Sequence, residues 1–182
     1  MNDLEKVFLS ELKDMYDCEQ QLVMALPRFE RSAESRELKG VFHDHCEQTK
    51  KHVNRLERVF GGIGEDPRRK TCTGIEGIID EGEVLAKEFE GNSALDAALI
   101  AEAQKAEHYE ITSYGSLCSW AKELGKTNAL SLLQENMTEE KEADHRLTRL
   151  GELARNPDAA RHDTPKHSEA ASKLSKVVSS GT

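Results

Sequence analysis

Carboxylates on the apolar sides of predicted helices are the residues of this sequence best placed to do chemistry. At 100° per residue, Glu107 and Glu110 share one side of their helix with alanine, isoleucine and tyrosine residues. Glu140 and Asp144 lie on the apolar side of a second helix, and Glu19 lies on that of a third. Burying an unpaired carboxylate is costly, and no lysine or arginine falls on these arcs. Bound metal ions are therefore the expected source of positive charge.

The remaining long helix carries two histidines on its apolar side. His45 and His52 are two helical turns apart. Thr49 lies between them, at the position where a two-metal site in a helical bundle would normally have a glutamate that bridges the ions. Imidazole is a ligand for iron and manganese, so both histidines are candidate metal ligands. In the alternative interpretation they are buried neutral side chains that hydrogen-bond Glu19 or Tyr16.

Other polar residues near these helices are weaker candidates. Glu142 and His145 spell a literal Glu-x-x-His motif, but they lie on the polar side of their helix together with Glu139. We therefore expect neither Glu142 nor His145 to be a core ligand. Tyr114 follows Glu107 by seven residues and either hydrogen-bonds a ligand carboxylate or fills the core, with core packing the favoured interpretation.

Helices must position these side chains. The hydrophobic periodicity of the sequence predicts five helices. Apolar residues recur every three or four positions over residues 4–26, 38–59, 75–89, 100–121 and 130–147. Ser35, and Asn92 or Ser93, are the expected N-cap residues, and Pro27 is expected to kink the first helix. Four long helices, two short loops and one long connection predict an all-α, ferritin-like antiparallel four-helix bundle whose crossover carries an extra short helix.

Turn residues at positions 61–67, 90–93 and 156–158 divide the chain. Residues 1–155 are expected to form the bundle. Residues 156–182 are small and polar, and we expect a disordered or loosely helical C-terminal tail.

Composition narrows the classes of function. Asp and Glu number 34 against 25 Lys and Arg, and the net charge of -9 argues against binding to nucleic acid. The longest stretch without a charged residue is residues 111–121, too short to span a membrane. The N-terminus lacks an apolar signal core, so the expected location is the cytoplasm. Four cysteines without a CxxC spacing are expected to be reduced thiols.

Six short motifs share their order and spacing with a known family. They are SELKDMYDCEQQL (10–22), ALPRF (25–29), HCEQT (45–49), CTGIEGIIDEG (72–82), AEHYEITSYG (106–115) and EEKEAD (139–144). Together they resemble the YciE/YciF family of ferritin-like bacterial stress proteins over about residues 3–153. The resemblance implies a four-helix bundle with a crossover helix, a dinuclear iron-type site and a homodimer.

The resemblance also assigns roles to individual residues. Glu19, Glu107 and Glu140 match the central carboxylates of the ferritin-like pattern, and Glu110 matches the extra glutamate of rubrerythrin-like sites. On the last helix the usual histidine is missing, and Asp144 is the candidate replacement. The expected metal ligands are Glu19, His45, His52, Glu107, Glu110, Glu140 and Asp144.

Two functions follow as hypotheses. The first is a di-iron stress-response protein that oxidises Fe(II) or consumes peroxide, with manganese or zinc as alternative metals. The second is a non-catalytic dimeric helical-bundle module whose metal site is degenerate or empty. The observation that distinguishes them is whether oxygens of Glu19, Glu107 and Glu140 lie about 2.0–2.3 Å from a common ion.

Overall fold

The computed structural model describes residues 1–161, and these residues are almost entirely helical. The elements are α1 (Asp3–Ser32), α2 (Arg36–Gly62), α3 (Thr73–Glu88), α4 (Leu95–Glu123), α5 (Thr127–Leu150), the π-helical turn η1 (Gly151–Arg155) and α6 (Asn156–Arg161). The last 21 residues of the predicted tail, 162–182, lie outside the described part of the chain.

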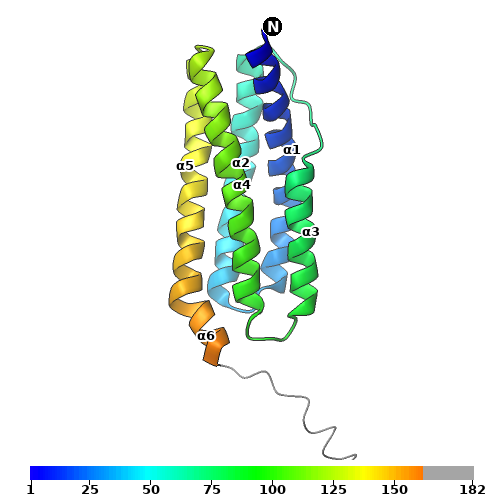
Figure 1. The fold of residues 1–182 in the computed structure, drawn as a ribbon, viewed down its shortest axis with the longest axis vertical. Coiled ribbons are helices and arrows are strands. Elements are labelled where there is room, and N and C mark those ends of the chain that lie inside the picture. Colours follow the sequence, from blue (N-terminus) through cyan, green and yellow to red (C-terminus); the bar gives the residue numbers. More distant parts are fainter. Residues whose placement is uncertain (162–182) are drawn as a thin grey trace, which may run out of the picture.

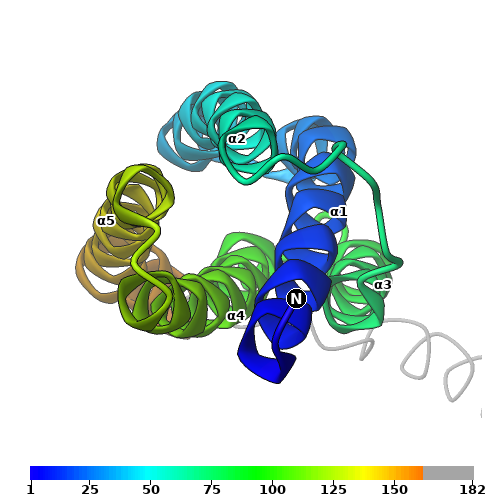
Figure 2. The same ribbon diagram turned by 90° about the horizontal axis from the view of Figure 1, so that it is seen from above.

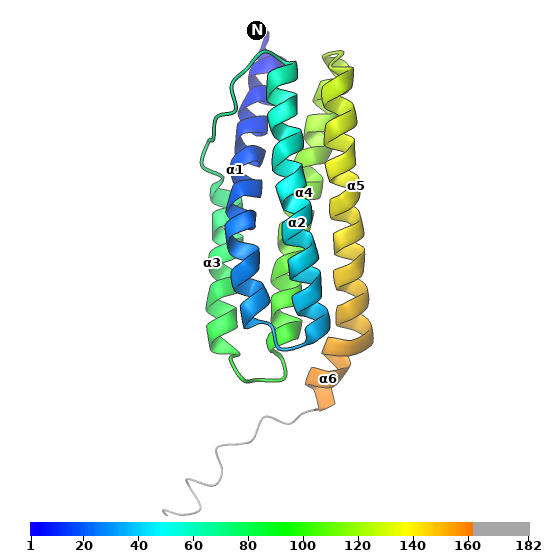
Figure 3. The ribbon, with the colours of Figure 1, turned by 180° about the vertical axis from the view of Figure 1, so that it is seen from behind.

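Four long helices form the bundle (Figure 1). Viewed along the bundle, α1, α2, α5 and α4 follow one another around a common centre, and neighbouring helices run antiparallel (Figures 2 and 3). The long connection after α2 descends outside α1 and leads into α3, which packs against α1 and α4. This arrangement confirms the predicted ferritin-like bundle with an extra helix in its crossover.

Capping side chains fix where the helices begin. Asn2 and Glu5 form a reciprocal capping box at the start of α1, and the Ser35 hydroxyl accepts a hydrogen bond from the Leu38 amide at the start of α2. The expectation for α4 was wrong, because its N-cap residue is Ala94. Asn92 instead accepts a hydrogen bond from the Ala94 amide, one residue before the helix begins.

Helix α1 continues through Pro27 to Ser32. A proline in a helix has no N–H group, so the carbonyl of Val23 loses its partner four residues later. The thiol of Cys46 on α2 replaces that donor, with its Sγ 3.8 Å from the Val23 carbonyl oxygen. A contact between neighbouring helices thus compensates for the missing hydrogen bond.

The described chain remains helical beyond residue 155, where the bundle was expected to end. Pro157 stands in the first turn of α6, a position at which a missing N–H group leaves no helical hydrogen bond unmade. Over residues 1–161, none of the helices has an apolar stretch long enough to cross a membrane.

Candidate metal centre

Six of the seven predicted ligands meet in the middle of the bundle. Glu19 comes from α1, two histidines from α2, two glutamates from α4 and Glu140 from α5, and none of them is more than 6% exposed. They form two groups that share Glu140: His45, Glu107, Glu110 and Glu140 in one, and Glu19, His52 and Glu140 in the other. Within each group, one potential ligand atom per residue lies within 4.8 Å of every other. This geometry suits two neighbouring ions.

Most of these carboxylate oxygens lack a hydrogen-bond donor. Both oxygens of Glu110, Oε2 of Glu19 and Oε2 of Glu107 are buried without a hydrogen bond. Buried polar atoms are normally paired, so several unpaired oxygens at one place mark a site that could hold a cation. The donor set of four carboxylates and two imidazoles fits iron, manganese or zinc.

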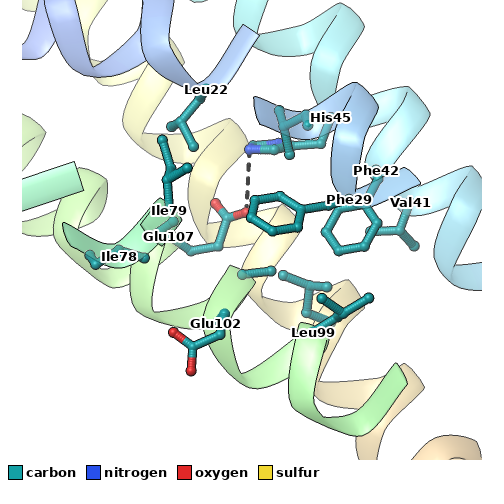
Figure 4. A pocket seen from close by; sticks show the side chains of 14 residues that line it. Leu22, Phe29, Val41, Phe42, His45, Ile78, Ile79, Leu99, Glu102 and Glu107 are labelled. Carbon is teal, nitrogen blue, oxygen red and sulfur yellow. Dashed lines mark ion pairs between the residues drawn. The ribbon is translucent and has the colours of Figure 1, made fainter. Parts of the chain in front are cut away.

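His45 is the imidazole of the first group. Its Nε2 atom lies 3.3 Å from Glu107 Oε1 (Figure 4). The same atom lies 3.9 Å from Glu140 Oε2. Burial lowers the pKa of His45, and the opposing effect of Glu140 does not reverse this shift. His45 is therefore neutral at pH 7, the form that can bind a metal.

His52 has carboxylates on both sides of its ring. Nδ1 lies 2.7 Å from Glu140 Oε1 and 3.4 Å from Glu19 Oε1, and Nε2 lies 2.7 Å from Glu139 Oε2. Burial lowers the pKa of His52, but Glu19 and Glu140 outweigh it and raise the pKa to about 11. In the metal-free protein His52 is consequently an imidazolium that neutralises part of the carboxylate charge.

The pKa values of the two glutamates on α4 are raised, whereas the pKa of Glu140 is lowered. Desolvation, together with the nearby charge of Glu140, raises the pKa of Glu107 and of Glu110 well above the ordinary value. Burial also opposes ionisation of Glu140, but the close contact with His52 and its positive charge lower the pKa of Glu140. Burial thus favours the protonated form of Glu107 and Glu110, and His52 supplies positive charge beside Glu140.

Glu139 and Arg55 orient His52, and sequence reasoning missed both. The expectation that Glu139 faces the polar side was wrong, because its carboxylate contacts His52 Nε2 and its side chain is only 25% exposed. Arg55 donates two hydrogen bonds of 2.8 Å to the two oxygens of Glu139. Helical periodicity gave no signal for this contact, because a glutamate beside the apolar arc can bend its long side chain inward.

Tyr114 hydrogen-bonds a ligand carboxylate, the interpretation that the sequence did not favour. Its hydroxyl donates to Glu19 Oε1 and accepts a 2.8 Å hydrogen bond from Asn136 Nδ2. Asn136 Oδ1 in turn accepts from Arg55. A continuous polar network thus runs from Arg55 to Glu19 through the buried core.

Asp144 and Thr49 lie apart from the ligand groups. Asp144 accepts a 3.0 Å hydrogen bond from Gln104, its other neighbour is His108, and it belongs to neither group. It is one helical turn beyond Glu140, at a level where α4 presents Gln104. Thr49 is buried, but its hydroxyl donates to the carbonyl of His45.

A small apolar cavity adjoins His45 and Glu107 (Figure 4). Its volume is about 30 Å³, enough for a molecule of a few atoms. Its apolar lining includes Leu22, Phe29, Phe42, Ile79 and Leu99.

A ferritin-like four-helix bundle with a buried histidine–carboxylate cluster defines the class of this protein. A family model described as Domain of unknown function (DUF892) matches residues 3–160, and the chain belongs to this family. Protein YciF of Escherichia coli (strain K12) is 40% identical over 151 residues, which cover 82% of this chain and 91% of YciF. These findings confirm the resemblance drawn from the six motifs.

Solved structures show the same fold. The crystal structure of the E. coli stress protein YciF matches with a TM-score of 0.80 and 40% identity, over 83% of this chain and 96% of that one. YcfI of Rhodopseudomonas palustris matches with a TM-score of 0.79 and 39% identity, over 81% and 94%. A Xanthomonas campestris protein with 17% identity and a TM-score of 0.68, over 88% and 98%, supports the fold alone.

Proposed function

We propose that this chain is a di-iron stress-response protein that oxidises Fe(II) with hydrogen peroxide or dioxygen as the oxidant. The observation that carries the proposal is the pair of buried ligand groups that share Glu140. A single group would suit one structural ion, whereas two groups joined by a common carboxylate suit two ions. A bound pair of ferrous ions supplies two electrons, the number needed to reduce one peroxide molecule to water.

The donor set supports iron. Four glutamates and two histidines provide hard oxygen and intermediate nitrogen ligands, and neither ligand group contains a cysteine. Such a set also accepts manganese and zinc, so metal supply and redox chemistry decide among the three metals. Only the redox-active ions support the proposed reaction.

The surrounding residues hold the ligands and their protons in place. Tyr114 hydrogen-bonds Glu19, and Glu139 fixes the ring of His52 by contacting Nε2. With Nε2 engaged, Nδ1 is the nitrogen that faces Glu140 and remains available as a ligand. Because burial raises the pKa values of Glu107 and Glu110, protons compete with a metal ion for these two carboxylates.

The cavity beside His45 and Glu107 supports access for a small oxidant. Its mainly apolar lining and its volume of about 30 Å³ suit a small uncharged molecule such as dioxygen or hydrogen peroxide. Fe(II) and a small oxidant are therefore the proposed substrates.

Oxidation of Fe(II) can be followed by stopped-flow absorbance under anaerobic conditions, with hydrogen peroxide added to iron-loaded protein. We expect oxidation much faster than in protein-free buffer, with one peroxide consumed for every two Fe(II). Glu107→Gln should abolish the acceleration, whereas Asp144→Asn, outside both ligand groups, should retain it. Equal rates with and without protein would contradict the proposal.

A specific observation also favours a second function, a non-catalytic helical-bundle module. The pKa of His52 is raised to about 11, and the positive charge of His52 stabilises the ionised form of Glu140 without a metal ion. Thr49 also occupies a buried position on α2 without offering a carboxylate. A protein that retains no metal and folds equally well without it would support this second function.

A further inference from the structure

Two alanines on the inner side of α4 leave room for the cavity beside His45 and Glu107. Ala103 and Ala106 follow Leu99 by four and seven residues, so all three lie on the same side of the helix as Glu107. An alanine side chain ends at Cβ, and both alanines line the cavity. Because Ala106 is only 7% exposed, a larger side chain at this position would have to occupy the cavity.

The wall of the cavity is almost entirely apolar. Only three of its 14 lining residues have a polar side chain, and these are His45, Glu102 and Glu107. Each of the helices α1 to α5 contributes at least one buried apolar side chain: Leu22, Phe42, Ile79, Leu99 and Leu147. An apolar cavity of this kind stays dry and takes up apolar molecules such as xenon.

The three polar side chains do not make the cavity a site for polar molecules. The Glu102 carboxylate is turned away from His45 and Glu107 (Figure 4), and its Oε1 atom accepts a 2.7 Å hydrogen bond from Lys105. His45 and Glu107 belong to the first ligand group, so a bound metal ion would engage their ligand atoms. A buried water molecule typically makes about three hydrogen bonds. Water and hydrogen peroxide would therefore lose hydrogen bonds on entering the cavity, whereas an apolar diatomic molecule has none to lose.

We propose that this cavity is a binding site for a small apolar gas molecule, that Ala103 and Ala106 keep it open, and that its ligand in the reaction is dioxygen. The choice of dioxygen rests on the proposed function, whereas the gas-binding site does not. Dioxygen takes one electron from each of two Fe(II) ions and two protons, and becomes hydrogen peroxide. By holding dioxygen beside the ligand groups, the cavity favours dioxygen over peroxide as the oxidant at low concentrations of both.

Xenon binding to the metal-free protein tests the site without any metal chemistry. The full chain is treated with a chelator, placed under xenon pressure and studied by NMR of its methyl groups. We expect saturable shifts concentrated at the methyl groups of Leu22, Ile79 and Leu99, which line the cavity. An absence of shifts at these three residues would overturn the proposal.

Variants that fill the cavity test the role of the two alanines. Ala106→Val and Ala103→Leu should each weaken xenon binding by about tenfold or more, because the added carbons take the space of the gas. Ala129→Val is the matched control, since Ala129 is as buried as Ala106 but lies outside the cavity. Circular dichroism shows that each variant retains its helices. Wild-type xenon affinity in both filling variants would contradict the assignment.

The dioxygen assignment is tested on iron-loaded wild type and Ala103→Leu with equal iron content. In the variant we expect the KM for dioxygen to rise by about tenfold, and the peroxide-dependent rate of Fe(II) oxidation to fall much less. An equal loss with both oxidants would overturn the assignment to dioxygen. Xenon binding without any Fe(II) oxidation would contradict the proposed function alone and support the gas-binding site. Fe(II) oxidation without xenon binding would contradict the gas-binding site alone.

Discussion

His52 Nδ1 lies 2.7 Å from Glu140 Oε1, yet the two atoms are not in hydrogen-bond geometry. The second ring nitrogen of His52 contacts Glu139, whose carboxylate is held by Arg55. Two ligand atoms from different helices thus point toward a common place in the core. The metal-free protein supplies charge balance there with protons, and a metal ion would replace them.

Metal binding should therefore release protons. His52 must lose its proton to act as a ligand, and Glu107 and Glu110 must also ionise. Because the pKa of His52 is about 11, metal affinity should rise across pH 6 to 8, by about tenfold per pH unit for each displaced proton. Calorimetry in buffers of different ionisation enthalpy measures the released protons. A pH-independent affinity without proton release would contradict this account.

The contact between Glu139 and Arg55 should stabilise the fold in a defined pH range. Burial opposes ionisation of Glu139, but Arg55 and His52 lower its pKa to about 2, below the ordinary value of 4.5. A carboxylate whose pKa is lowered by folding stabilises the folded state at pH values above its pKa in the unfolded chain. This contribution is lost as the pH falls toward 2, the pKa in the folded protein. Glu139→Gln should lower the free energy of unfolding by about 2 kcal/mol at pH 7, and much less near pH 2. Urea denaturation at several pH values measures the difference, and the exposed Glu142→Gln provides a control.

Tyr114→Phe should weaken both the fold and the site. The variant removes the hydrogen bond to Glu19 and leaves the amide of Asn136 only its long, 3.5 Å hydrogen bond to the His52 carbonyl. We expect a loss of about 1–3 kcal/mol in the free energy of unfolding and a 10- to 100-fold loss of metal affinity. Unchanged affinity would show that Tyr114 serves packing alone.

Two glycines of α3 offer a matched test of its packing. A Cβ atom on Gly82 would lie 2.9 Å from the Phe29 ring, whereas Gly77 faces open space. Gly82→Ala should therefore destabilise the protein by about 1–3 kcal/mol. Gly77→Ala should stabilise it by up to about 1 kcal/mol, because alanine is the better helix former. Thermal denaturation of both variants distinguishes a close α1–α3 contact from a loose one.

The sequence predicts the fold well because the apolar positions, capping residues and loop lengths are local signals. The same arithmetic places Glu19, Glu107 and Glu140 inward, since an angle around one helix depends on that helix alone. It does not give the level at which two helices face each other, and Asp144 consequently pairs with Gln104. It also gives no account of side-chain reach, which brings Glu139 to His52 from beside the apolar arc.

The central claim is that the two ligand groups hold two metal ions. The most direct measurement is metal content by inductively coupled plasma mass spectrometry, after anaerobic loading with Fe(II) and desalting. The account predicts close to two irons per chain, loss of both in the Glu107→Ala, Glu140→Ala double variant, and retention in Asp144→Asn. No retained iron, or equal iron in wild type and double variant, would contradict it.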